Sequence, residues 1–357
     1  MGEAKYKQLA DTIEQRIQNG TYTVGNTIPS ELQLQKEFQM SRHTVRQAIA
    51  LLVQEGYLRS EKGSGTFVLR KTRANVGNDL IPTKKIGVVM TYLSDYIFPE
   101  IIRGIEGTLS KKGYSLLLAS TNNCHDKERE CLIQMFNQEV DGIIVEPTKS
   151  NQFNPNFDQY VKISQKNLPL VMLNANYDAF DFPCVRVDDE KCGFLAMEYL
   201  INHHNKRLLM VIKIDDLQGK LRLNGMMQAC EKYQVQFSSE DIITYTTENI
   251  ESVANQVLNR LSQNPEITGI VCYNDEIAYK IMHELKIHDF HIPEDYAIMG
   301  IDNASISGLA EVNLTTINHP KEELGKAAAE MIIQMIEGEK VTDYIFQPYI
   351  VERTSIY

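Results

Sequence analysis

Short apolar runs alternate with stretches of helical periodicity through most of the chain after residue 85, and this alternation restricts the fold more than any other feature. Strands that alternate with helices at this spacing form parallel sheets covered by helices on both faces. The pattern runs once and then restarts, with strand candidates at 86–90, 114–121, 142–147 and 168–174, and again at 183–189, 207–215, 269–275 and 296–302. The repetition predicts two doubly wound α/β lobes with a cleft between them.

Polar side chains stand where these predicted strands end. The carboxyl ends of parallel strands meet at one edge of a sheet, where open α/β proteins bind ligands. Carboxylates and amides can bond adjacent sugar hydroxyls, an arginine adds donors, and aromatic rings can cover the C–H surface of a sugar. The candidates for such a site are Tyr96, Phe98, Glu146, Asn174, Asp189, Arg222, Asn274, Asp275 and Asp302. Any one of the Asp and Asn residues could instead serve a turn or a helix cap.

The first seventy residues follow a different pattern. Helical periodicity spans roughly 5 to 19, and it recurs from 31 to about 39 and from 42 to about 54. Strand candidates at 57–60 and 66–69 flank a glycine-rich turn, which predicts a hairpin. Three short helices followed by a hairpin are typical of a winged helix-turn-helix domain.

The third of these helices carries basic side chains at its N-terminal end. Ser41 is a good N-cap, and Arg42, His43 and Arg46 lie off the apolar stripe that contains Val45. A recognition helix presents this end to base edges, and arginine is well shaped to bond guanine or a phosphate. The alternatives are that the two arginines are solvated helix residues and that His43 is an ordinary surface histidine.

The net charge of −11 is unevenly distributed. Through residue 75 there are eleven basic and seven acidic residues, so the acidic excess lies in the rest of the chain. A basic end on an acidic body suits a protein that touches nucleic acid at one end only. A chance excess in a short stretch is the alternative.

The N-terminal motifs resemble the winged-helix domain of the GntR (gluconate-repressor) family. The resemblance rests on PSE at 29–31, SRHTVRQA at 41–48 and GSGTFV at 63–68, in order and spacing. It implies DNA contacts by the recognition helix, by the N-terminus of the second helix and by the wing, and the predicted DNA-binding residues are Lys5, Glu31, Arg42, His43, Thr44, Arg46, Lys62, Gly63 and Gly65. His43 is less typical of the family, and Glu31 could merely serve the dipole of its helix.

The body resembles the sugar-sensing domain of the LacI/GalR repressors. The runs GIVCYNDEIA, LRLNGMM, GIDNA and LTTINHP stand where that family has its strand-end and crossover motifs. The resemblance implies a two-lobed, periplasmic-binding-protein-like fold with effector contacts at Glu146, Asn174, Arg222, Asn274 and Asp302; Asp189 and Asp275 are included because they too stand at strand ends. Asn303 departs from the family, which often has a second Asp there, so no role is assigned to it.

The two resemblances define the domain boundaries that we expect. A DNA-binding domain at 1–70 is followed by a linker at 71–84 and a sensor domain at 85–357. Within the sensor, the N-terminal lobe is expected at about 85–174 and 316–340, and the C-terminal lobe at about 175–315 and 341–357.

The pairing of the two domains suggests a partner and an effector. TYLSDYIFPEIIRGIE, STNN and DGIIVEPTKS are similar to the arabinose-responsive repressors of bacteria, which have this pairing. The resemblance implies a repressor of sugar-utilisation genes that binds a pseudopalindromic operator as a homodimer and is released by L-arabinose. A different pentose or hexose is the alternative effector.

Other functions receive less support from the sequence. The absence of a long apolar run and the N-terminal composition predict no signal peptide and no membrane span, hence a cytoplasmic protein. The six cysteines form no CxxC pair, and His283 and His288 have HExxxH rather than HExxH spacing, so we expect no metal and no cofactor. A transport-type sugar-binding protein and a sugar-converting enzyme are the rival functions, and no catalytic arrangement stands out for the second.

Overall fold

The computed structural model describes the chain except residues 1–4, 55, 62–64, 70–82, 204–206 and 306–311. The chain divides into two compact units, Met1–Thr83 and Lys84–Tyr357, which are described separately. The linker expected at 71–84 falls almost wholly on residues outside this description, so its boundaries stay a prediction. None of the described helices combines the length and the apolar character needed to cross a membrane.

The first unit is a three-helix bundle with a hairpin. Its elements are α1 (Lys5–Gln18), α2 (Glu31–Phe38), α3 (Arg42–Gln54), β1 (Leu58–Glu61) and β2 (Gly65–Val68). Leu9 and Ile13 of α1, Leu34 of α2 and Val45 and Leu52 of α3 are fully buried against one another. The apolar stripes that predicted the helices therefore form the core, and the antiparallel pair β1–β2 is the expected hairpin.

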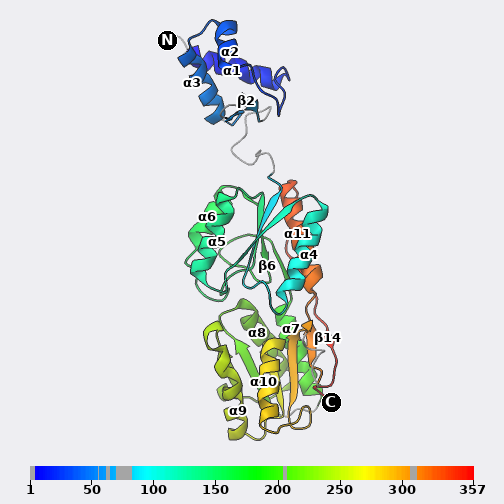
Figure 1. Cartoon of the computed structure of the whole chain (residues 1–357). Coiled ribbons are helices and arrows are strands. Elements are labelled where there is room, and N and C mark those ends of the chain that lie inside the picture. Colours follow the sequence, from blue (N-terminus) through cyan, green and yellow to red (C-terminus); the bar gives the residue numbers. More distant parts are fainter. Residues whose placement is uncertain (1–4, 55, 62–64, 70–82, 204–206, 306–311) are drawn as a thin grey trace. The chain divides into compact units, whose positions relative to one another are not determined.

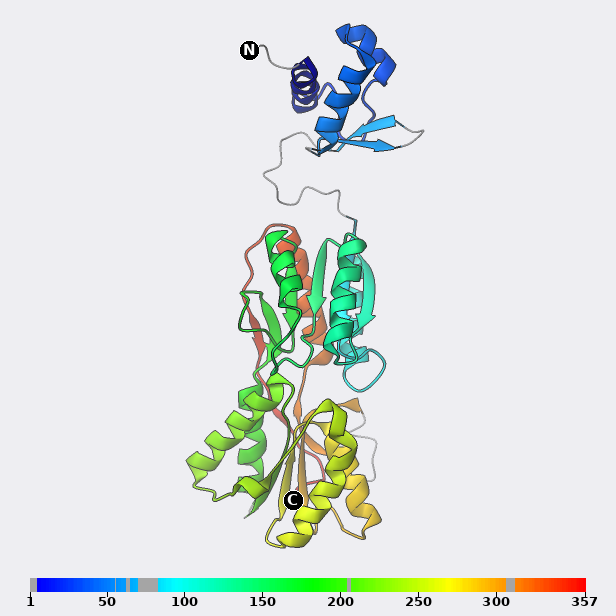
Figure 2. The ribbon, with the colours of Figure 1, turned by 90° about the vertical axis from the view of Figure 1, so that its left-hand side faces the viewer.

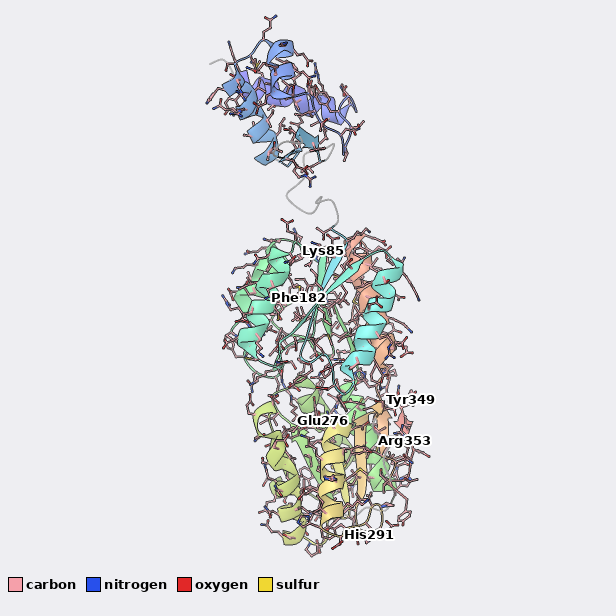
Figure 3. The ribbon with its side chains drawn as sticks, viewed as in Figure 1. Lys85, Phe182, Glu276, His291, Tyr349 and Arg353 are labelled. Atoms are coloured by element: carbon pink, nitrogen blue, oxygen red, sulfur yellow. The ribbon has the colours of Figure 1, made fainter. Side chains whose placement is uncertain are left out.

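The second unit contains two six-stranded sheets, one in each lobe. The first sheet has the order β13-β7-β6-β5-β3-β4, and the second has the order β14-β12-β11-β10-β8-β9. Among the described residues of this unit, the strand pairings are parallel except that of β12 with β14. Figure 3 labels Lys85 and His291 at opposite ends of this unit.

Helices cover both faces of each sheet, as the alternating pattern predicts (Figure 1). In the first lobe the strands are β3 (Lys85–Met90), β4 (Ser115–Ser120), β5 (Gly142–Val145), β6 (Leu170–Leu173), β7 (Cys184–Val187) and β13 (Tyr344–Phe346). Helices α4 (Phe98–Lys111) and α11 (Lys321–Ile336) pack on one face, and α5 (His125–Asn137) and α6 (Phe157–Gln165) pack on the other.

The second lobe repeats this layering (Figure 2). Its strands are β8 (Leu208–Lys213), β9 (Ile242–Tyr245), β10 (Gly269–Cys272), β11 (Ala297–Asp302), β12 (Thr315–Asn318) and β14 (Ile350–Val351). Helices α7 (Asp189–Asn202) and α8 (Leu217–Tyr233) cover one face, and α9 (Val253–Gln263) and α10 (Asp275–Ile287) cover the other. Two 3-10 helices, η1 (Ser239–Asp241) and η2 (Thr247–Ser252), flank β9.

The expected lobe boundaries are wrong at three strands. The sequence predicts that β7 belongs to the second lobe, but Met172 of β6 pairs with Cys184 of β7, which places β7 in the first sheet. Thr315–Asn318 belongs to the second sheet and Tyr344–Phe346 to the first. The chain therefore crosses between lobes after β7, after β12 and after β13. A buried strand has the same apolar pattern in either sheet, so the pattern could not assign these strands.

One short helix, α6, is not predicted from the sequence. α6 has nine residues, and its buried apolar side chains are Tyr160 and Ile163. Two such positions are too few to give a clear helical period.

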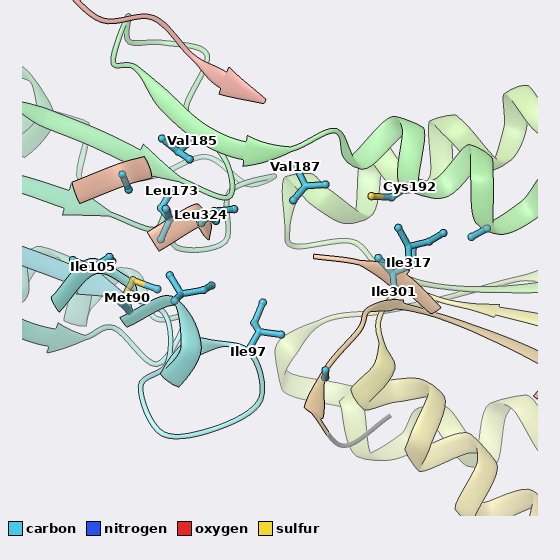
Figure 4. Close-up of a cluster of buried hydrophobic side chains, with 14 of the residues drawn as sticks. Met90, Ile97, Ile105, Leu173, Val185, Val187, Cys192, Ile301, Ile317 and Leu324 are labelled. Carbon is cyan, nitrogen blue, oxygen red and sulfur yellow. The ribbon is translucent and has the colours of Figure 1, made fainter. Parts of the chain in front are cut away.

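A single hydrophobic cluster extends from the first lobe into the second. Met90 and Leu173 belong to the first sheet, and Ile301 and Ile317 belong to the second. Figure 4 shows Val187 between these groups, at the point where the chain passes from β7 into α7. Buried apolar side chains of both lobes thus form one continuous cluster at this crossing.

Candidate functional site

The N-terminal end of α3 presents polar side chains to solvent. Arg42, His43 and Arg46 are exposed, whereas Val45 is fully buried. The Ser41 hydroxyl accepts a hydrogen bond from the backbone N–H of Thr44 at 3.2 Å and caps the helix. The cap and the buried stripe together fix which side of α3 is free to contact a partner.

Glu31 at the start of α2 holds both arginines. Its carboxylate accepts hydrogen bonds from Arg46 Nε at 3.0 Å and from Arg42 Nε at 3.2 Å. The Arg46 guanidinium, assisted by that of Arg42, lowers the pKa of the Glu31 carboxyl. Within the described residues, the Nη groups of both arginines remain available for acceptors outside the chain.

The other predicted DNA-binding residues lie on other elements of the first unit or fall outside the described residues. Lys5 is exposed at the first turn of α1. Gly65 begins β2 with a φ of 120°, a backbone conformation that glycine adopts without strain. Lys62 and Gly63 fall outside the described residues, so their roles stay predictions.

A cavity lies between the two lobes of the second unit, at the carboxyl ends of both sheets. It encloses about 620 Å³ of space not occupied by atoms, part of it open to solvent. Seven of the nine predicted effector residues line it: Tyr96, Phe98, Glu146, Asn174, Asp189, Arg222 and Asp302. Strand-end position thus identified much of the cavity wall.

Arg222 is the centre of the second-lobe wall. Its Nε donates to Asp189 Oδ1 at 2.8 Å, one Nη donates to the Tyr273 carbonyl at 2.5 Å, and the other donates to Asp302 Oδ1 at 3.0 Å. Burial opposes the charge of Arg222, but the Asp302 and Asp189 carboxylates outweigh it and raise the pKa of the guanidinium. The fork of donors is therefore fixed and charged.

Tyr96 reaches from the first lobe to the second. Its hydroxyl donates to Asp302 Oδ2 at 2.7 Å and accepts from the backbone N–H of Asp275 at 3.1 Å. Burial, together with the Asp302 charge, raises the pKa of the phenol well above its usual value, so it is a hydroxyl at any physiological pH. Tyr96, Asn174 and Asp302 have φ values of 60°, 62° and 110°, and such strained backbone tends to cluster at functional sites.

The first-lobe wall contains a paired carboxylate and amide. Glu146 accepts hydrogen bonds from the Thr91 N–H at 3.0 Å and from Asn174 Nδ2 at 2.7 Å. Burial nevertheless raises the pKa of Glu146. Asn174 Oδ1 is buried and has no hydrogen-bond partner within the described residues. A buried acceptor left without a partner costs free energy, which a ligand hydroxyl donating to it would recover.

Two predicted residues do not line the cavity. The Asn274 side chain accepts from the N–H of Ile277 at 3.0 Å and caps α10. Asp275 accepts from the Ala304 N–H at 2.8 Å and from the Thr316 hydroxyl at 2.6 Å. Both side chains bond groups within the second lobe. They therefore serve the helix cap and the loop contacts that are the structural alternative for any Asp or Asn at a strand end.

Sequence reasoning missed several polar residues of the cavity wall. They share a position at or shortly after the end of a strand, and they are Thr91, Asn123, Asp216, Tyr273 and His319. The same strand-end rule, applied to every strand, would have found them. His319 is buried, its Nδ1 has no partner among the described residues, and burial lowers its pKa to about 4. It therefore presents a neutral imidazole to the cavity.

No group of three or more His, Cys, Asp or Glu side chains in the described part of the chain is placed to hold a metal ion. The six cysteines are free, and five of them are buried.

Comparison with known proteins gives the same two-part division. Residues 5–68 match the family model of bacterial regulatory proteins of the gntR family, and residues 83–354 match that of periplasmic binding proteins and the sugar-binding domain of the LacI family. Among solved structures, a LacI family transcriptional regulator from Enterococcus faecium with bound ribose has a TM-score of 0.66 and 25% identity; the match covers 76% of this chain and 98% of that one.

Two curated relatives match over nearly their full length, and both are named as arabinose metabolism transcriptional repressors. The protein from Geobacillus stearothermophilus is 43% identical, over 98% of this chain and 97% of the relative. The protein from Halalkalibacterium halodurans is 38% identical, over 99% and 96% respectively. The chain therefore belongs to the family of these transcriptional repressors, with a GntR-type regulatory domain ahead of a LacI-type sugar-binding domain.

Proposed function

We propose that this protein represses arabinose-utilisation genes in the cytoplasm and leaves its operator when L-arabinose binds between the lobes of the sensor. One observation carries the proposal: carboxylate, amide, guanidinium and aromatic groups from both lobes converge on one cavity. These are the groups that bond sugar hydroxyls and cover sugar C–H surface. The names of the two relatives favour arabinose as the effector.

The two lobes would contribute different contacts to the sugar. Asn174 Oδ1 offers an acceptor to a sugar hydroxyl, and Glu146 beside it offers a second. Arg222, held by two carboxylates, offers donors that need no reordering on binding. Because contacts come from both lobes, bound sugar favours the arrangement in which the lobes are closed.

On the DNA side, α3 would enter the major groove by its N-terminal end. Arg42 and Arg46 would use the Nη groups that Glu31 leaves available, either on base edges or on phosphates. His43, Thr44, Lys5 and the wing around Gly65 would supply the remaining contacts. Two such domains in a homodimer fit the two half-sites of a pseudopalindrome.

Operator release in the presence of single sugars tests the proposal. Fluorescence anisotropy of a labelled duplex from the promoter of the arabinose-utilisation genes would be measured with L-arabinose, D-ribose, D-xylose or D-galactose. We expect L-arabinose alone to weaken operator binding, by about 5- to 150-fold. Release by another sugar, or by none, would contradict the proposed effector.

A variant of the recognition helix provides the control. Arg46→Ala should lose operator binding while L-arabinose still raises its melting temperature as in the unsubstituted chain. At a sugar concentration 100 times Kd that stabilisation is about 2.7 kcal/mol. Sequence-specific operator binding by Arg46→Ala would remove this arginine from DNA readout.

A further inference from the structure

The segment that follows β5 reaches from the first lobe to the second, beside the cavity. Ser150 Oγ accepts a hydrogen bond from the backbone N–H of Leu217 at 2.8 Å. Asn151 donates twice, from its backbone N–H to the Asp215 carbonyl at 3.1 Å and from Nδ2 to the Ile214 carbonyl at 2.9 Å. We call Lys149, Ser150 and Asn151 the latch.

Two further contacts join the latch region to η2 of the second lobe. Lys149 Nζ forms an ion pair with Glu248. The backbone N–H of Lys149 donates to Asn123 Oδ1 at 2.8 Å, and Asn123 Nδ2 donates to Thr247 Oγ1 at 2.8 Å. The latch thus contacts two separate segments of the second lobe.

A buried carboxylate anchors the latch to the first lobe. Glu128 of α5 is fully buried and accepts from the Thr148 N–H at 3.3 Å, from Asn154 Nδ2 at 2.7 Å and from Asn156 Nδ2 at 2.9 Å. Tyr160 and Tyr177 also donate to it. Because both ends of the segment are tied to one buried side chain, its tip is held in one position.

The backbone of the latch is strained. Lys149 has a φ of 43°. A lysine in the left-handed region is strained and persists only where surrounding contacts hold it. The interlobe bonds of the latch are such contacts.

The latch also acts on the helix that carries Arg222. Asp216, the N-cap residue of α8, makes no side-chain cap bond. Ser150 of the other lobe bonds the N–H of Leu217, the first residue of α8, and so takes over part of the cap's role. When the lobes separate, α8 loses this bond.

We propose that the latch sets the residence time of sugar in the cavity through the contacts that Lys149 and Asn151 make with the second lobe, outside the cavity wall. Ser150, the third latch residue, lines the cavity and is left unsubstituted in the test. This inference rests on the proposed function, because it assumes that sugar binds between the lobes. Lys149, Asn151 and Glu248 are not part of the cavity wall. A sugar held by both lobes leaves when the lobes part, and every bond from the latch to the second lobe must break at that step.

The test uses the full chain with the double substitution Lys149→Met and Asn151→Ala. Stopped-flow dissociation of L-arabinose, and of D-ribose as a second probe, should become about three- to tenfold faster, the range expected for the loss of one or two net hydrogen bonds. Lys280→Met is the matched control, because Lys280 pairs with Glu251 at 2.6 Å within the second lobe alone. The control should keep the original dissociation rate.

A cycle with Glu248 separates the ion pair from general effects of substitution. Glu248→Gln alone should speed dissociation as Lys149→Met does, and combining the two should add little, because either substitution removes the pair. Fully additive effects would exclude the pair as a unit of the latch.

Amide hydrogen exchange in the absence of sugar supplies an independent readout. The N–H groups of Asn151 and Leu217 make interlobe bonds, so peptides that contain them should exchange faster in the double variant. In Lys280→Met their exchange rates should be unchanged. Unchanged exchange, or unchanged sugar dissociation, would overturn the latch alone. If neither sugar binds the unsubstituted chain, the proposed function fails and the latch inference fails with it.

Discussion

At the scale of single residues, Asp275 marks the limit of reading function from strand ends. It stands three residues after the end of β10, at the start of α10, much as residues of the cavity wall stand shortly after other strands. Its carboxylate is nevertheless fully buried and joins the first turn of α10 to Ala304 and to Thr316 of β12. The family motifs were enough to place Arg222 and Glu146 in the site. The sequence could not distinguish a carboxylate that contacts ligand from one that holds the fold together, because both kinds stand shortly after the end of a strand.

The buried position of Asp275 predicts a pH dependence of stability. Burial, assisted by the Asp302 charge, raises the pKa of Asp275 from 3.8 to about 8. Between these values the unfolded chain is ionised while the folded chain keeps its proton, so stability falls as pH rises. Asp275→Asn cannot ionise, and its amide can still serve Ala304 and Thr316. Its stability relative to the unsubstituted chain should therefore increase between pH 5 and 7.5, by up to about 1.4 kcal/mol per pH unit.

Urea unfolding of the two proteins across that pH range measures this difference. His319, whose pKa is lowered to about 4, changes stability in the opposite direction below pH 6.5, but it is present in both proteins and cancels. A difference that stays flat with pH would show that Asp275 is ionised in the folded chain.

At the scale of elements, periodicity predicted the strands and helices well but not how the helices pack. In the second lobe, α7 and α8 approach so closely that a Cβ on Gly193 would lie 1.9 Å from the Arg222 carbonyl oxygen, and one on Gly225 would lie 1.8 Å from the Glu190 carbonyl oxygen. Gly104 and Gly325 play the same reciprocal part between α4 and α11. A glycine within a helical pattern does not indicate whether another helix backbone packs against it, so these contacts could not be inferred from one sequence.

The glycine contact between α7 and α8 predicts a linked loss of stability and sugar binding. Gly225→Ala forces the two backbones apart, which should cost at least about 1 to 3 kcal/mol of unfolding free energy. Arg222 is three residues away on α8 and bonds Asp189 of α7, so sugar affinity should fall as well. Thermal unfolding and calorimetric titration with L-arabinose measure the two effects.

Gly107→Ala is the matched control for this substitution. Gly107 lies within α4, and a Cβ there would meet no atom within 4 Å. Alanine should stabilise that helix by about 0.5 to 1 kcal/mol and leave sugar affinity unchanged. If Gly225→Ala behaved like Gly107→Ala, the close helix contact would not constrain the site.

At the scale of the molecule, the two-part organisation was readable because each part has its own motifs, and the family models divide the chain in the same way. The partition of strands between lobes was not readable. The chain crosses between the lobes three times, and the sheet that β7, β12 or β13 joins depends on the neighbouring strand with which it pairs. An apolar run in the sequence does not identify that neighbouring strand. The latch could not be predicted from the sequence either, because its polar residues have the composition of an ordinary surface loop.

The last prediction concerns the coupling between the two units, which obeys thermodynamic reciprocity. If L-arabinose weakens operator binding by some factor, operator must weaken L-arabinose binding by the same factor, typically about 5- to 150-fold. Calorimetric titration of L-arabinose into the full chain, with and without saturating operator duplex, measures one factor, and anisotropy with and without sugar measures the other. A duplex of scrambled sequence should leave sugar affinity unchanged, and in Arg46→Ala the operator duplex should have no effect on it. If saturating operator left the affinity for L-arabinose unchanged and L-arabinose left operator binding unchanged, the two sites would not be coupled and release by sugar would be excluded. Unequal factors would show that the two titrations measured different species, such as different oligomeric states at the two protein concentrations.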